Sequence, residues 1–219
     1  MTAPFNLKFR NDYDFKYAEP TELGTFVSNA YKNHVKTNYP AIGLTLSMDL
    51  REKNPAVGEP ITPYSIGDII NVEKKLVVFE NIDIAGLKTM LETSFREQDD
   101  GNHAKNFIEY SDNIAVDRYI NVSKDEPKIK QIYFKQNGIF IPLLDENSNP
   151  INKKLKFAIV TDTYTAGGSR EGLKEFKSFI PTRTDNLTNR DAVVKEFQRF
   201  EQEGINHFEA AKVNNFIKK

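Results

Sequence analysis

The sequence predicts an α+β fold: a largely antiparallel sheet with hairpins, helices packed on one face of it, and a helical segment at the C-terminus. Three observations support this prediction. An Asn-Gly dipeptide joins two β-rich runs within 131–141, which is typical of a tight hairpin. Apolar residues recur at helical spacing over 21–38 and 84–98. The strand and helix patterns do not alternate as strand–helix–strand units, so a wholly parallel sheet is not expected.

The composition is that of a globular protein with a substantial core. The 219 residues include 16 Phe and 9 Tyr, too many for a disordered chain. The chain has no Cys, which excludes a disulfide scaffold, thiolate catalysis, zinc fingers and iron–sulfur clusters. The net charge of −1 argues against a strongly basic nucleic-acid surface, although a local basic groove stays open.

No window approaches the roughly 18 consecutive apolar residues of a membrane span. The N-terminus lacks the apolar stretch of a secretory signal. We therefore expect no membrane partner and a cytoplasmic or virion-associated location.

The first half of the chain predicts two helices and several strands. Helix 21–38 begins after Pro20 with Thr21 as N-cap, and its apolar side chains share one face. Segment 41–51 alternates between apolar and polar residues, which predicts a strand with one buried and one solvent-exposed face. Short strands are expected at 66–72 and 76–79. A second helix follows at 84–98, capped by Asp83.

The second half is rich in hairpins before two closing helices. Strands are expected at 106–110 and 114–122, and the Asn137-Gly138 turn pairs Phe134 with Ile141. Pro142 cannot donate to a ladder, so its strand is expected at a sheet edge.

A further strand at 155–164 leads to a short helix at 170–179 and a helix from 189 that breaks at Gly204. We divide the chain into an α+β domain, 1–181, and a C-terminal helical appendage, 182–219, with a single domain as the open alternative.

The turn at 162–172 is a candidate anion site. Two glycines let a backbone approach a ligand closely, a serine can cap the following helix, and an arginine adds positive charge. The spacing matches neither the P-loop nor the dinucleotide-binding motif, and a flexible strand-to-helix connection is the competing interpretation. The candidate anion-binding residues are Gly167, Gly168, Ser169 and Arg170.

The hairpin at 128–141 is a candidate surface for single-stranded nucleic acid. Cations can follow phosphates while aromatic rings stack on bases. Successive strand residues face opposite sides, so only half of the set can line one groove, and an ordinary amphipathic hairpin is the competing interpretation. The candidate nucleic-acid-binding residues are Lys128, Lys130, Tyr133 and Lys135.

A proline-rich arm at 53–65 and an apolar stripe near the C-terminus predict contacts with protein partners or self-association. Extended arms and terminal helices can join subunits, whereas packing within the chain is the competing interpretation. The candidate interface residues are Pro55, Pro60, Pro63, Phe208, Phe216 and Ile217.

The residue patterns support no metal site, no cofactor and no catalytic residue. Histidines 34, 103 and 207 lie far apart in the sequence, and no ligand spacing joins them. We therefore rank first a non-enzymatic structural or assembly protein, with a virion or phage-tail component as one concrete form. A single-stranded nucleic-acid-binding protein using 128–141 ranks second. A phosphate-ligand-binding enzyme using 162–172 ranks third.

Overall fold

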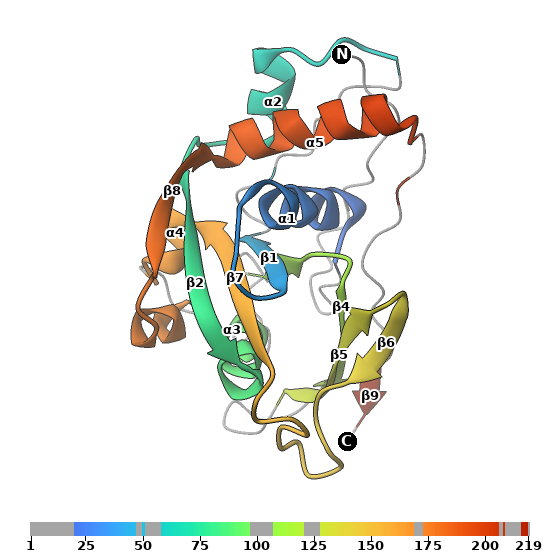
Figure 1. Cartoon of the computed structure of the whole chain (residues 1–219), viewed down its shortest axis with the longest axis vertical. Helices are drawn as coiled ribbons and strands as arrows, with labels where there is room; N and C mark the ends of the chain where they lie inside the picture. The colour runs from blue at the N-terminus through green and yellow to red at the C-terminus, as the bar shows by residue number, and fades with distance from the viewer. Residues whose placement is uncertain are drawn as a thin grey trace.

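The computed structural model describes residues 20–46, 50, 58–96, 107–120, 128–168, 173–205, 208 and 216–218. Within these residues the strands form a five-stranded sheet, order β3-β1-β7-β2-β8, and a four-stranded sheet, order β6-β5-β4-β9 (Figure 1). The strands are β1 (Ala41–Leu46), β2 (Lys75–Asp83), β3 (Ile108–Tyr110), β4 (Ile114–Ile120), β5 (Ile129–Gln136), β6 (Ile139–Pro142), β7 (Lys156–Asp162), β8 (Arg183–Thr188) and β9 (Phe216–Lys218). The α+β class is confirmed.

Six helices accompany these strands in the described part of the chain. They are α1 (Glu22–His34), α2 (Pro63–Ile69), α3 (Ile84–Arg96), α4 (Thr163–Ala166), the 3₁₀ helix η4 (Lys174–Ser178) and α5 (Asn189–Glu203). Thr21 accepts the amide of Gly24 and caps α1, as predicted.

The strand directions bring several segment ends to one edge of the five-stranded sheet. β1 and β7 run parallel, β2 runs antiparallel to β7, and β8 runs antiparallel to β2. The carboxyl ends of β1, β7 and β8 therefore lie on the same edge as the start of β2. We call this edge the carboxyl edge of the sheet.

Helices cover both faces of this sheet, so the prediction of helices on one face is wrong. On one side, α1 and α5 pack against β7, and Phe26, Val160 and Phe197 share a core. On the other side, α3, η4 and the four-stranded sheet form a second core, which includes Leu91, Phe134 and Ile159. The physical reason is that β7 is buried on both faces, from Phe157 to Asp162, and needs a cover on each.

Strand β1 also departs from its predicted pattern, because Ile42–Leu46 is buried on both faces. Its polar face packs under α1 rather than facing water. A Cβ atom at Gly43 would lie 1.7 Å from the carbonyl oxygen of Ser28 in α1. The alternation at 41–51 therefore arises from a glycine and small polar residues that let a helix approach closely.

Helix α2 occupies 63–69, where the sequence predicts a strand at 66–72. The Thr62 hydroxyl accepts a hydrogen bond from the Ser65 amide, and the Ser65 hydroxyl accepts one from the Thr62 amide. Pro63 is the first residue of the helix. This capping box starts a helix in a segment too short to show helical periodicity.

The C-terminal part is described at three places. α5 ends at Gly204 with a left-handed φ of 65°, as the predicted break requires. β8 joins the sheet and is missed by the sequence patterns, because its residues are mostly polar and half-exposed. Phe216 and Ile217, expected on a helical stripe, lie instead in β9, which pairs in parallel with β4.

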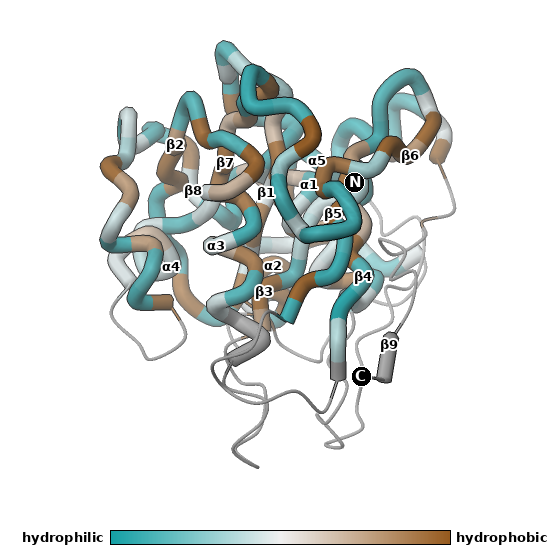
Figure 2. Tube along the Cα trace, turned by 90° about the horizontal axis from the view of Figure 1, so that it is seen from below, coloured by the Kyte–Doolittle hydropathy of each residue, from teal (hydrophilic) through white to brown (hydrophobic). Residues whose placement is uncertain are grey.

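The predicted hairpin is confirmed. Phe134 pairs with Ile141, and Gln136 pairs with Ile139. Asn137 and Gly138 both have positive φ, as a type I′ turn requires. Strand β6 is the edge of its sheet, in agreement with Pro142, and polar and apolar segments alternate along β5 (Figure 2).

The substitution Gly43→Ala should lower the free energy of unfolding by about 3 kcal/mol, because the new methyl group overlaps the Ser28 carbonyl and forces α1 away from β1. Thermal unfolding should then occur roughly 6–12 °C lower. The matched control is Gly67→Ala in α2, where the added Cβ would meet only the Arg190 side chain, at 3.7 Å. The control should change stability by about 1 kcal/mol at most, in the stabilising direction. Equal effects of both substitutions would contradict this account of β1.

Candidate functional site

Five side chains gather at the carboxyl edge of the five-stranded sheet, and we name them the carboxyl-edge cluster. One comes from the end of β7 and one from α4, one lies immediately before β2, and two come from the first turn of α5. In open α/β sheets, ligands bind outside the carboxyl ends of the strands, which makes this edge the candidate site. The members are Lys74, Asp162, Tyr164, Asn189 and Arg190.

Asp162 is fully buried and begins α4. Its Oδ1 accepts the amides of Tyr164 at 2.8 Å and Thr165 at 3.1 Å, and its Oδ2 accepts the Thr165 hydroxyl at 3.3 Å. The carboxylate is therefore solvated by backbone and hydroxyl donors, which compensates for its removal from water.

Lys74 places a positive charge beside Asp162. Its Nζ lies 3.9 Å from the Asp162 Oδ1 and 4.3 Å from the centre of the Tyr164 ring. The Lys74 side chain is only 12 % exposed. A partly desolvated ammonium over an aromatic face is held more firmly than a surface lysine.

The first turn of α5 holds the segment that carries Lys74. Asn189 accepts the Lys74 amide at 3.0 Å, donates its own amide to the Lys74 carbonyl at 2.8 Å, and donates Nδ2 to the Val72 carbonyl at 3.0 Å. Arg190 donates to the carbonyls of Ile70 and Asn71 at 3.1 and 3.0 Å. Asn189 and Arg190 thus fix residues 70–74, although they lie more than 100 positions later in the chain.

The predicted anion-binding residues lie just past this cluster. Gly167 and Gly168 follow the C-terminal end of α4, and their amides donate to the carbonyls of Thr163 and Thr165. Ser169 and Arg170 lie outside the described residues. Anion binding by these four residues stays a prediction.

The predicted nucleic-acid-binding residues differ in their exposure to solvent, and nucleic-acid binding by them stays a prediction. Lys128 is 2 % exposed, whereas Lys130 and Lys135 are exposed. Tyr133 donates its hydroxyl to the Asp117 Oδ2 at 3.0 Å. Burial, together with the hydrogen bond to Asp117 and its negative charge, raises the pKa of Tyr133.

The predicted interface residues are dispersed. Pro60 is exposed, Pro63 begins α2, and Pro55 lies outside the described residues. The Phe208 ring packs within the chain, 5.7 Å from the ring of Phe26 and 6.0 Å from that of Phe200. Phe216 and Ile217 pair with β4 through their backbones. Docking of protein partners at these residues stays a prediction.

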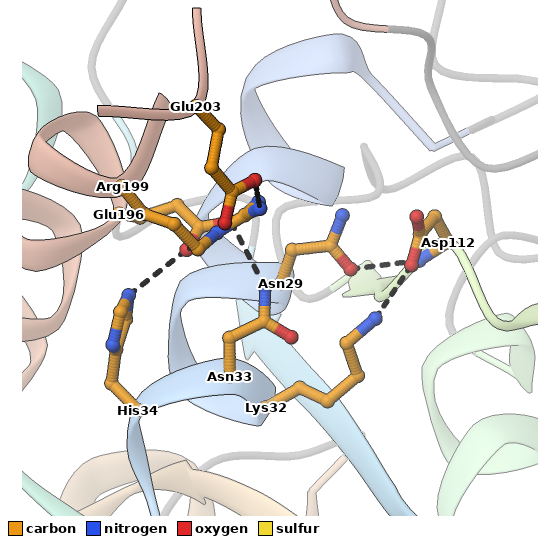
Figure 3. Close-up of polar contacts among 8 residues, drawn as sticks. All are labelled: Asn29, Lys32, Asn33, His34, Asp112, Glu196, Arg199 and Glu203. Carbon is orange, nitrogen blue, oxygen red and sulfur yellow. Dashed lines mark hydrogen bonds and ion pairs between the residues drawn. The ribbon is translucent and has the colours of Figure 1, made fainter. Parts of the chain in front are cut away.

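A second polar group, the α1–α5 cluster, joins the two helices at the fully buried carboxylate of Glu196 (Figure 3). Glu196 binds the His34 Nε2 at 2.9 Å and the Asn33 Nδ2 at 3.0 Å. It also accepts two hydrogen bonds from Arg199, at 3.0 and 2.8 Å. Arg199 reaches Glu203 at 2.6 Å. Alongside this group, Lys32 pairs with Asp112 at 2.6 Å.

Burial alone would raise the pKa of Glu196, but the hydrogen bonds from His34 and Arg199 outweigh it and hold that pKa below its ordinary value. The same contact with Glu196 raises the pKa of Arg199. Glu196 and Arg199 are therefore both ionised at neutral pH, and the contacts of Glu196 with Asn33 and His34 tie α5 to α1.

The described residues contain no group of three or more His, Asp or Glu side chains placed to hold a metal ion. Within the same part of the chain, no helix is long and apolar enough to cross a membrane.

The model of the 5'-nucleotidase C-terminal domain family matches residues 3–178, most of the chain. The chain belongs to the 5'-nucleotidase C-terminal domain family. The match includes β7, α4 and Lys74 but ends before β8 and α5.

Solved structures with a similar fold include two nucleotidases. A 5'-nucleotidase precursor from Thermus thermophilus superposes with a TM-score of 0.66 at 13 % identity, over 91 % of this chain and 35 % of that one. The NAD nucleotidase of Haemophilus influenzae superposes with a TM-score of 0.60 at 14 % identity, over 91 % of this chain and 33 % of that one. The chain thus spans about a third of their length. No curated protein sequence matches it.

The family overturns the functional ranking drawn from the sequence. The expectation of a structural or assembly protein, with its virion or phage-tail form, is wrong, because the chain belongs to the 5'-nucleotidase C-terminal domain family. The alternative of a single-stranded nucleic-acid-binding protein is overturned by the same finding. The ranking rested on missing local motifs, whereas the carboxyl-edge cluster is assembled from segments that no local motif connects.

Sequence reasoning misses Lys74, Asn189 and Arg190, and it includes Asp162 and Tyr164 only as part of the candidate turn at 162–172. Asp162 does carry one local signal: an Asp at a strand end, followed by Thr163 and Thr165, can cap a short helix. Lys74, Asn189 and Arg190 are brought to this edge by the pairing of β2 with β7 and β8, which the sequence does not specify.

The substitution Glu196→Gln should lower the free energy of unfolding by about 2 kcal/mol at pH 7, because it removes the charge that His34, Asn33 and Arg199 surround. Since the pKa of Glu196 is lowered in the folded state, its stabilisation is complete above the ordinary glutamate pKa of about 4.3 and is lost as the pH falls through the lowered value. The stability difference between wild type and variant should therefore shrink below about pH 4. Calorimetry across this range measures it.

Glu203→Gln is the control, because Glu203 binds the same Arg199 but its side chain is 49 % exposed. It should change stability by less than about 1 kcal/mol. A pH-independent effect of Glu196→Gln would contradict the ionised state inferred for Glu196.

Proposed function

We propose that this chain is a nucleotide-recognition domain that binds a nucleoside monophosphate at the carboxyl-edge cluster. The family match supports the class of ligand, since the family is named for 5'-nucleotidases. The observation that supports the place is the ammonium of Lys74, held between Asp162 and the ring of Tyr164 at the carboxyl ends of β7 and β1.

The chemistry of the cluster suits a phosphate attached to an aromatic base. Lys74 supplies a fixed positive charge for a phosphate oxygen, and the half-buried Tyr164 ring beneath the ammonium leaves its exposed part for contact with a base. Asp162 orients Lys74, and its own charge is already shared with the two amides at the start of α4.

The proposal concerns recognition, because the chain spans about a third of the length of the enzymes it superposes on. Hydrolysis by the chain itself is a separate step, and it is measured by phosphate release in the same samples as binding.

A panel of nucleoside 5'-monophosphates, the matching nucleosides and inorganic phosphate should separate the contributions to binding. At least one monophosphate should raise the unfolding temperature and bind more tightly than its nucleoside and than phosphate alone. Isothermal titration then gives the affinity. If none of the monophosphates binds at millimolar concentration, the proposed function is wrong.

Lys74→Met should weaken monophosphate binding about tenfold or more, because it removes a charge-assisted contact while keeping the length of the side chain. The matched control is Lys75→Met, the neighbouring lysine, which is exposed at the start of β2. Lys75→Met should weaken binding less than about twofold, since an exposed charge is screened by salt. Equal losses in both variants would indicate general electrostatic attraction rather than a site at Lys74.

A further inference from the structure

The segment after the family-matched region reaches back into the candidate site. The family match ends at residue 178, whereas Asn189 and Arg190 belong to the first turn of α5. Both contact the chain at 70–74, immediately before β2. The candidate site therefore includes structure that lies outside the matched domain.

Asn189 contacts residues 72–74 through directional hydrogen bonds rather than through apolar packing. The residue is fully buried, and its side-chain oxygen and nitrogen are both used: Oδ1 accepts the Lys74 amide, and Nδ2 donates to the Val72 carbonyl. Its backbone amide donates to the Lys74 carbonyl. Lys74 is thus held at its amide and at its carbonyl by one residue of α5.

The rest of α5 is anchored elsewhere, so Asn189 is held in place independently of Lys74. Thr188 and Asp191 form a capping box at the start of the helix. Phe197 packs on Phe26 with ring centres 4.6 Å apart, and Glu196 is held by the α1–α5 cluster. The anchored helix thus holds Asn189 against the Lys74 backbone.

We infer that Asn189 is a positioning residue for Lys74, which makes α5 a part of the nucleotide site although it lies outside the family-matched region. This inference rests on the proposed function for the ligand that Lys74 would bind. The positioning itself is independent of any ligand. When Asn189 loses its side-chain contacts, the 72–74 backbone loosens and the ammonium no longer stays over Tyr164.

The test uses the whole chain and two readouts. The first is the NMR shift of the Lys74 side-chain methylene protons next to Nζ, which the Tyr164 ring moves upfield in the wild type. Tyr164→Leu gives the shift of Lys74 without that ring. In Asn189→Ala, the Lys74 shift should move most of the way to the Tyr164→Leu value. The second readout is the affinity for the monophosphate that binds best, which should fall about tenfold.

Thr188→Ala is the control for a merely structural effect, because it removes the side-chain cap of α5 and leaves the contacts between Asn189 and Lys74 in place. It should lower the stability of the chain without moving the Lys74 shift. If both variants move the shift equally, or if Asn189→Ala leaves it unchanged, the inference is overturned.

Asn189→Asp keeps the acceptor for the Lys74 amide and turns the donor toward Val72 into a repelling oxygen. This nearly isosteric variant should give a Lys74 shift between those of wild type and Asn189→Ala, and it decides the question if Asn189→Ala does not fold. An unchanged shift in Asn189→Asp then overturns the inference. A wild-type chain that binds no nucleotide refutes the proposed function, whereas the Lys74 shift still tests the role of Asn189.

Discussion

The burial of β7 on both faces is the constraint on which the rest of this structure depends. The strand is paired with β1 on one side and with β2 on the other, so each of its residues has neighbours within the sheet. From Phe157 to Val160 its side chains lie alternately in the two cores, and Thr161 and Asp162 are buried beyond them. A strand of this kind needs a cover over each face, and the chain supplies α1 with α5 on one side and α3 with the four-stranded sheet on the other. The close approach of α1 at Gly43 follows from the same requirement.

Covering both faces also determines what α5 does. Its apolar side packs on α1. The polar part of the same interface is centred on Glu196, whose buried carboxylate accepts hydrogen bonds from donors of both helices. Such a buried pair specifies position more than it adds stability, because desolvation offsets much of the attraction. With the helix fixed along its length, its first turn meets the start of β2 at a defined place. The geometry of the carboxyl edge is thus a consequence of packing further along the same helix.

Local sequence signals predict those elements that local physics determines. The Asn137-Gly138 turn, the Thr21 cap of α1 and the glycine that ends α5 are all predicted correctly, because each depends on residues within one turn. α2 is missed because its capping box outweighs the β-branched residues Ile69 and Ile70 that follow. The environment of β1 is predicted wrongly. The alternation of apolar and polar residues shows which side chains are able to face water, but in the structure α1 covers the polar face. The carboxyl-edge cluster is not predicted because it joins residues 74, 162 and 189, which only the strand order brings together.

The proposed phosphate contact of Lys74 depends on how Asp162 and Tyr164 hold its ammonium. The Asp162 Oδ1 already accepts two amides of α4 and lies 3.9 Å from the ammonium of Lys74, beyond hydrogen-bonding distance. The carboxylate therefore orients Lys74 mainly through its field. The Tyr164 ring adds attraction from a face that carries no net charge. Asp162 and Tyr164 thus fix the position of the Lys74 ammonium, although no direct hydrogen bond joins Lys74 to Asp162.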